Sequence, residues 1–386
     1  MTFLTILHAD ILTPTGLLRD AILTAENGII ISVEPYRETT PLAAGHVLDG
    51  RGLLASPGWI DIQINGGFGF DFTFQPESIW EVASRLPRLG VSAFLPTIIT
   101  SPLEVLRRAI KVFQAGPPPE WHGATSLGLH LEGPFLNPIK IGAHNPQHLL
   151  APDIDLIPEW RVENGIRMVT LAPELPGALD LVHELRQRGI VVSAGHSLAT
   201  YEQAIAAFEA GVSCATHLFN AMPPLEHRSP GLVGALLTRP TIPVGLIADG
   251  IHSHPALLQL TWMCKGAKSL ILVTDAISAL EMPTGEYQLG DQVIYVDSAN
   301  VPSKEGMFAG STLTLQVAVQ NMMKFCNLRL EEILPTVTST PAALLGLTNK
   351  GRLQAGCDAD ITLLNPKGEV KATIVAGEVE YRTSNL

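Results

Sequence analysis

Short apolar runs recur eight times between residues 59 and 275, and longer segments with a helical pattern separate them. The runs lie at residues 59–65, 92–97, 126–132, 167–172, 190–196, 213–217, 244–249 and 270–275. Most are rich in Val, Ile and Leu and are bounded by turn residues, which is typical of strands buried on both faces of a parallel sheet. Hydrophobic residues make up 46% of the chain and charged residues only 16%, in agreement with that interpretation.

Helical segments fit between these runs, and most of them end at a glycine. We expect helices at residues 76–89, 102–115, 178–188, 199–210 and 254–264. Strands that alternate with helices indicate either a barrel or a doubly wound open sheet. The count of eight favours the α/β fold of a TIM-like (β/α)8 barrel, which we place at residues 56–349 as the catalytic domain.

The two ends of the chain have a different pattern from the middle. Residues 1–55 and residues 350–386 contain short β-like runs and little helical pattern. Because chain ends often lie close together in space, we expect both segments to pair into one small β-sandwich domain beside the barrel. The alternative is two unrelated additions.

Composition excludes several classes of partner. The net charge of −12 does not suit a protein that follows a nucleic-acid backbone or an anionic membrane. No run of about 18 apolar residues is present, so we expect no membrane span. The first ten residues do not resemble a secretion signal, and the four cysteines form no C-x-x-C pair. We therefore expect a cytoplasmic protein that acts on a small molecule.

Polar residues stand at the ends of the expected strands, where active residues of such barrels lie. They are Gln63, Asn65, Glu132, His196, His217, Asp249 and Asp275. Two imidazoles and one carboxylate match a catalytic metal site, with zinc favoured although iron, cobalt or manganese could occupy the same ligands. Each residue alone has a plainer interpretation, such as a structural histidine or, for Asp275, a helix cap. Their recurrence at strand ends favours the metal site.

Eight segments occur in the order found in one enzyme family. They are 57–61 (PGWID), 130–135 (HLEGPF), 142–146 (GAHNP), 193–197 (SAGHS), 215–222 (ATHLFNAM), 248–252 (ADGIH), 273–276 (VTDA) and 309–311 (AGS). This succession resembles the N-acetylglucosamine-6-phosphate deacetylases of the amidohydrolase superfamily, and the likeness covers nearly the whole chain. The resemblance implies hydrolysis of N-acetylglucosamine 6-phosphate to glucosamine 6-phosphate and acetate, in amino-sugar catabolism or cell-wall recycling.

The resemblance also implies a role for each matching residue. Glu132, His196 and His217 would hold one divalent metal ion, with Asp275 as the catalytic acid and base. His252 would contact the acetyl carbonyl. The other implied substrate-binding residues are Ala143, His144, Asn220, Ala221, Asp249, Phe308, Ala309 and Gly310. Arg228 matches the family's phosphate-binding arginine, which reaches across from the other subunit, so a homodimer is implied.

One departure concerns the number of metals. Many members of the superfamily carry His-x-His at the end of the first strand and bind two ions, whereas this chain has Gln63 and Asn65 there. Amides are weaker ligands than imidazoles, so we interpret this place as a vestigial second-metal position and expect one ion. His227 and His254 also lie near the site in sequence, and for them we favour exposed loop residues.

Two other functions stay open at this stage. The first is another amidohydrolase, acting on a different N-acyl compound or a cyclic amide with the same barrel and metal ligands. The second is a non-catalytic barrel that serves as a scaffold, which should have lost the ligands that this chain retains.

Overall fold

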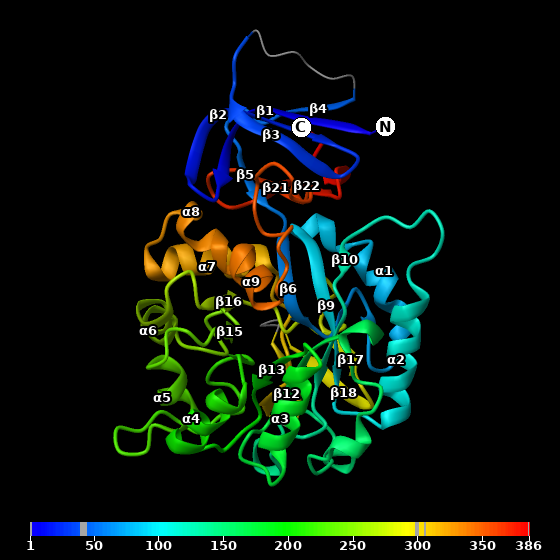
Figure 1. Cartoon of the computed structure of the whole chain (residues 1–386), viewed down its shortest axis with the longest axis vertical. Coiled ribbons are helices and arrows are strands. Elements are labelled where there is room, and N and C mark those ends of the chain that lie inside the picture. The colour runs from blue at the N-terminus through cyan, green and yellow to red at the C-terminus, as the bar shows by residue number, and fades with distance from the viewer. Residues whose placement is uncertain (1, 39–44, 298–300, 305, 385) are drawn as a thin grey trace.

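The computed structural model of the chain describes residues 2–38, 45–297, 301–304, 306–384 and 386, and its main body is a barrel of parallel strands (Figure 1). The barrel strands are β6 (Trp59–Ile64), β9 (Val91–Ile99), β10 (Thr125–Ser126) with β11 (Leu129–Glu132), β12 (Ile166–Leu171), β13 (Val191–Ala194), β14 (Cys214–Ala215), β15 (Val244–Leu246) and β16 (Leu270–Leu272). Each pairs in parallel with its neighbour along the chain. The expected eight-stranded α/β architecture is confirmed.

Backbone hydrogen bonds between the first and last strand regions bring the sheet round on itself. The Asp275 N–H donates to the Gln63 carbonyl at 2.9 Å, and the Asn65 N–H donates to the Ala276 carbonyl at 2.7 Å. These contacts lie just beyond β6 and β16. They bring the polar end of the last barrel strand, β16, directly beside the polar end of the first, β6.

Helices cover the outside of the barrel, as the sequence pattern predicts. They are α1 (Ile79–Ala83), α2 (Leu103–Ala115), α3 (Ala178–Gln187), α4 (Tyr201–Ala210), α5 (Gly231–Leu237), α6 (Pro255–Lys265), α7 (Leu315–Cys326), α8 (Leu330–Ile333) and α9 (Ser339–Leu344). The segment 76–89, expected as one helix, is instead split into η1 (Pro76–Ser78), α1 and η2 (Leu86–Leu89). Pro87 has no N–H for the Ala83 carbonyl, which accepts from the Ala124 N–H at 2.9 Å instead. Among the described residues, no helix combines the length and apolar character that crossing a bilayer requires.

Strands from both ends of the chain share one sheet beside the barrel, as Figure 1 shows by its blue and red strands. Its members are β1 (Phe3–Thr13), β2 (Gly16–Glu26), β3 (Ile29–Pro35), β4 (His46–Asp49), β5 (Leu54–Pro57), β21 (Ile361–Leu364), β22 (Val370–Val375) and β23 (Glu378–Arg382). The N-terminal β5 pairs antiparallel with the C-terminal β21. The expected pairing of the two ends is thus present, while the domain boundaries at residues 55 and 350 stay a prediction.

This terminal sheet lies where the first barrel strands begin. The Gly58 N–H donates to the Asp360 carbonyl at 2.8 Å, and the Thr362 hydroxyl donates to the Gly90 carbonyl at 2.9 Å. Gly58 and Gly90 immediately precede β6 and β9. The sheet is therefore at the opposite end of the barrel from the polar strand ends.

A small four-stranded sheet, which the sequence analysis did not predict, follows the last barrel strand. It consists of β17 (Gly285–Leu289), β18 (Gln292–Val296), β19 (Pro302–Lys304) and β20 (Met307–Phe308). Its buried residues Leu289, Ile294 and Val296 share a hydrophobic cluster with Ile99, the last residue of β9, and with Ala143 from a barrel loop. This packing places the small sheet over the polar end of the barrel.

Candidate active site

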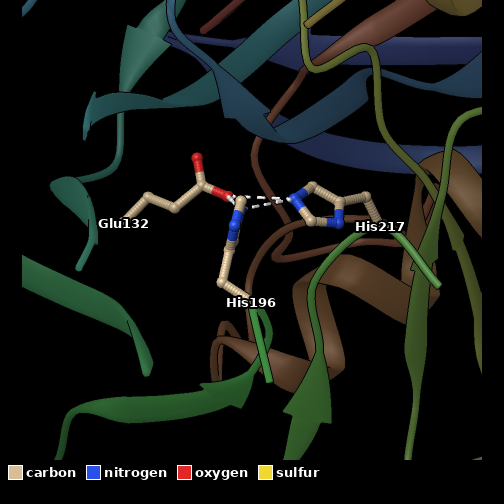
Figure 2. Close-up of side chains that lie close together, drawn as sticks. All are labelled: Glu132, His196 and His217. Atoms are coloured by element: carbon tan, nitrogen blue, oxygen red, sulfur yellow. Dashed lines mark hydrogen bonds and ion pairs between the residues drawn. The ribbon is translucent and has the colours of Figure 1, made fainter. Parts of the chain in front are cut away.

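Three side chains from three strand ends converge at one point, as Figure 2 shows. Glu132 is the last residue of β11, and His196 and His217 each lie two residues beyond β13 and β14. Glu132 Oε1 lies 3.2 Å from His196 Nε2 and 3.1 Å from His217 Nε2, and the two imidazole atoms are 3.1 Å apart. All three residues are at most 4% exposed, so the cluster is shielded from bulk water.

The chemistry of this triangle fits a divalent metal ion. His196 Nδ1 lies 2.8 Å from the Lys140 carbonyl, an acceptor, so Nδ1 donates and the neutral ring has its lone pair on Nε2. Lone pairs that converge within about 3 Å repel one another unless a cation lies among them. Tetrahedral ligands at 2.0–2.1 Å from zinc are roughly 3.3 Å apart, close to the observed separations. One ligand atom from each of the three residues lies within 4.8 Å of the other two, close enough for a single ion to bind all three.

Mutual interactions shift the charges within the triangle. Burial alone would raise the pKa of Glu132, but in the metal-free site the imidazoles of His196 and His217, when protonated at Nε2, donate to it and lower its pKa well below the ordinary value. Burial would lower the pKa of His217, but its bond to Glu132 raises it overall. The carboxylate thus stays ionised and ready to bind a cation.

The backbone at these strand ends is strained. His196, His217 and Asp275 have φ angles of 49°, 27° and 49°, in the left-handed region that residues with a side chain rarely adopt. Such conformations persist only where the surroundings hold them, and they gather at functional sites. The turns aim these side chains into the barrel mouth.

Asp275 lies beside the triangle and is held by the two amides of strand one. Its Oδ1 accepts from Asn65 Nδ2 at 2.8 Å and from Gln63 Nε2 at 3.2 Å. Gln63 Nε2 also lies 3.2 Å from Glu132 Oε1, so one amide bridges Asp275 and the candidate metal ligand Glu132. Burial raises the pKa of Asp275 to about 6, and the Glu132 carboxylate adds to the rise. Gln63 and Asn65 therefore orient the Asp275 carboxyl group.

His252 is positioned by Asp249, which lies three residues beyond β15. His252 Nδ1 lies 2.6 Å from Asp249 Oδ2, and Asp249 Oδ1 accepts from the His252 backbone N–H at 2.8 Å. The His252 ring also packs against Phe308, with ring centroids 5.0 Å apart. These contacts fix the ring and leave Nε2 as the nitrogen available to a ligand.

A cavity of about 430 Å³ joins these groups. Its lining includes thirteen residues predicted for the site: Asn65, Glu132, Ala143, His144, His196, His217, Asn220, Ala221, His252, Asp275, Phe308, Ala309 and Gly310. Gln63 and Asp249 contact members of this set from behind. Arg228 is exposed in the loop before α5 and is not among the lining residues. His254 caps α6 through Nδ1, which accepts from the Ala256 N–H at 3.2 Å, and His227 is exposed.

Several lining residues were missed by sequence reasoning. They are Ile99, Ile139, Lys140, Gly142, Ile247, Leu289, Gly306 and Met307. The sequence offered a signal for Gly142, because it directly precedes the predicted Ala143. In the structure its φ is 62°, and an added Cβ would lie 3.3 Å from His196 Cε1. Lys140 had none, since its contact with His196 uses a backbone carbonyl.

Comparison with known proteins places this geometry in a family. A model of the amidohydrolase family matches residues 54–379. An N-acetylglucosamine-6-phosphate deacetylase of Homo sapiens is 40% identical over 354 residues, which cover 86% of this chain and 85% of the human protein. Its counterpart from Lysinibacillus sphaericus is 37% identical over 341 residues, covering 88% of each chain.

A solved structure resembles the whole chain. It is that of an N-acetyl-D-glucosamine-6-phosphate deacetylase from Mycobacterium smegmatis, a mutant with one aspartate replaced by alanine, in complex with N-acetyl-D-glucosamine-6-phosphate. It has a TM-score of 0.88 and 32% sequence identity, and the match covers 99% of both chains.

Proposed function

The chain belongs to the N-acetylglucosamine-6-phosphate deacetylases of the amidohydrolase family, and we propose that its cavity removes the acetyl group from N-acetylglucosamine 6-phosphate. The products are glucosamine 6-phosphate and acetate. The observation that carries the proposal is the convergence of Glu132, His196 and His217 beside Asp275.

Glu132, His196 and His217 hold one divalent metal ion in this proposal, with zinc as the favoured metal. When bound, such an ion lowers the pKa of water to about 7 and polarises the carbonyl of the substrate. An amide needs this help because it is a weak electrophile with a poor leaving group. Gln63 and Asn65 face Asp275, so we assign no second ion to them.

Asp275 carries the proton. Both amide donors go to Oδ1, and we assign Oδ2 to accept the proton of the attacking water. A carboxyl whose pKa is raised to about 6 is a base at neutral pH and is still acidic enough to return the proton. Asp275 then protonates the departing sugar nitrogen, and the C–N bond breaks.

His252 and the cavity wall orient the substrate. His252 Nδ1 donates to Asp249, and in the ring form that carries a proton on both nitrogens the Nε2–H donates to the acetyl oxygen, where negative charge develops. We assign sugar contacts to the predicted lining residues, among them His144, Asn220 and Ala221. These contacts hold the acetamido group within reach of Asp275.

The phosphate of the substrate needs a cationic partner. Arg228 does not line the cavity of its own chain. We propose that Arg228 of a second copy of the chain binds the phosphate in a homodimer, since its loop is exposed and free to project from the surface. A guanidinium pairs with phosphate through charge-assisted hydrogen bonds.

All four cysteines are free thiols, which supports our assignment of the protein to the cytoplasm.

The test is acetate release from N-acetylglucosamine 6-phosphate before and after chelation. Chelation should abolish release, zinc should restore it, and elemental analysis should give about one ion per chain. Glu132→Gln should lose both the ion and activity, whereas Glu184→Gln, on the outer helix α3, should keep both. Activity that persists in metal-free protein would exclude the proposal, and two ions per chain would contradict our assignment of Gln63 and Asn65.

A further inference from the structure

Glu174, three residues beyond β12, ties two loops of the barrel mouth together with one carboxylate. Its Oε2 accepts from the Ser197 hydroxyl at 2.7 Å. Its Oε1 accepts from the Leu198 N–H at 2.6 Å and from Asn137 Nδ2 at 2.8 Å. Strand four carried no predicted site residue, yet this side chain from its end is bonded to three donors.

The first of the two loops begins at His196. Ser197 and Leu198 follow it directly, so Glu174 fixes the chain on the C-terminal side of a ligand whose own φ is 49°. The His196 carbonyl accepts from the Asn137 N–H at 2.9 Å, which ties the ligand to the second loop as well. A strained residue needs such external support to keep its side chain in one direction.

The second loop leads from Asn137 to Lys140. Asn137 Oδ1 accepts from the Ile139 N–H at 2.9 Å and begins η3 (Pro138–Lys140). The Lys140 carbonyl then lies 2.8 Å from His196 Nδ1. The contacts thus form a closed ring that runs from Glu174 through Asn137 and Lys140 to the His196 imidazole, and back through Ser197.

We propose that Glu174 is a positioning residue that sets the direction and tautomer of His196. This inference rests on the metal site proposed above. Glu174 places the Lys140 carbonyl where it holds the proton on Nδ1, so that Nε2 faces Glu132 and His217. Partners that orient a metal-binding histidine in this way typically raise metal affinity 10–100-fold.

The experiment measures zinc affinity by competition with a chromophoric chelator, without reference to turnover. Glu174→Ala should bind zinc roughly 10–100-fold more weakly, and its cobalt-loaded form should have an altered visible spectrum. Glu174→Gln should recover most of the affinity, because its oxygen can still accept from Leu198 and Asn137 while Ser197 turns to accept from the amide. The control is Glu184→Ala on α3, which loses a 2.7 Å hydrogen bond from the C-cap residue Arg188 and should bind zinc normally.

The outcomes separate this inference from the metal proposal. If the unsubstituted protein binds no zinc, the metal site itself fails. If it binds zinc and folded Glu174→Ala binds equally well, the positioning role fails alone. Should Glu174→Ala not fold, Ser197→Ala and Asn137→Ala each remove one arm of the ring, and unchanged affinity in both would overturn the inference.

Discussion

Replacing Asp275 with asparagine removes the proposed proton carrier with little change of shape. The Asn65 and Gln63 amides both donate to Oδ1, and an asparagine oxygen can accept the same two bonds. Asp275 is not one of the three residues, Glu132, His196 and His217, that we assign to the metal ion. Asp275→Asn should therefore fold and bind the metal like the unsubstituted protein.

The loss in rate follows from the two proton transfers assigned to Asp275. An amide nitrogen cannot accept the proton of water, and general acid–base catalysis contributes about 10²–10⁴-fold. At about 1.36 kcal/mol per factor of ten, kcat should fall by an amount equal to roughly 2.7–5.4 kcal/mol of activation free energy. The loss should fall on kcat rather than KM, because the sugar contacts lie elsewhere in the cavity.

The assay is steady-state acetate release with the metal content of each sample determined in parallel. Asp71→Asn is the matched control, since Asp71 is another buried carboxyl with a raised pKa and does not line the cavity. It should keep kcat far closer to the unsubstituted value. Near-normal turnover by metal-loaded Asp275→Asn would refute the assignment of the proton carrier.

Three further substitutions test other parts of the molecule. Arg228→Ala should impair turnover of the 6-phosphate far more than turnover of unphosphorylated N-acetylglucosamine, and equal losses on both substrates would move the phosphate elsewhere. Burial raises the pKa of Asp71 to about 7, so the folded state favours the protonated form and loses stability as pH rises from about 4 to 7, by at most about 1.4 kcal/mol per pH unit. Asp71→Asn cannot ionise and should flatten this slope in urea unfolding at pH 5 and pH 8; parallel slopes would contradict the reasoning. Gly310→Ala should lower both Tm and kcat, because the glycine has a φ of 61° and an added Cβ would lie 2.4 Å from Ile277 Cγ2 and 2.8 Å from the Asp275 carbonyl. Unchanged kcat and Tm would show that the backbone there can shift freely.

The barrel could be predicted because its strands are buried on both faces and so appear as apolar runs. Breaks that divide one such run into two strands could not be predicted. The expected strand 126–132 is two short strands, because Gly128 has a φ of 131° and lies against Arg167 and Gly165. The small sheet from β17 to β20 was missed although Gly290 and Asp291 form a two-residue turn between its first strands, a pattern typical of a hairpin.

The site could be predicted to the extent that its chemistry lies in side chains at strand ends. Those residues stand at recognisable places, and their types are rare in a packed core. Glu174 and the Lys140 carbonyl could not be found in this way, since the first lies in a loop and the second is a backbone atom. Their importance comes from contacts between residues 23–56 positions apart in the sequence, which no local pattern records.

The antiparallel pairing of β5 with β21 has a consequence for how the protein emerges from the ribosome. Thr362 pairs with Ser56, so one edge of β5 receives its neighbour about 300 residues after β5 itself is made. At roughly 5–20 residues per second this delay lasts about 15–60 s. During that interval the edge is an open template for strands of other nascent chains, and a translational arrest after the barrel would leave the polypeptide prone to aggregation even with a completed catalytic centre.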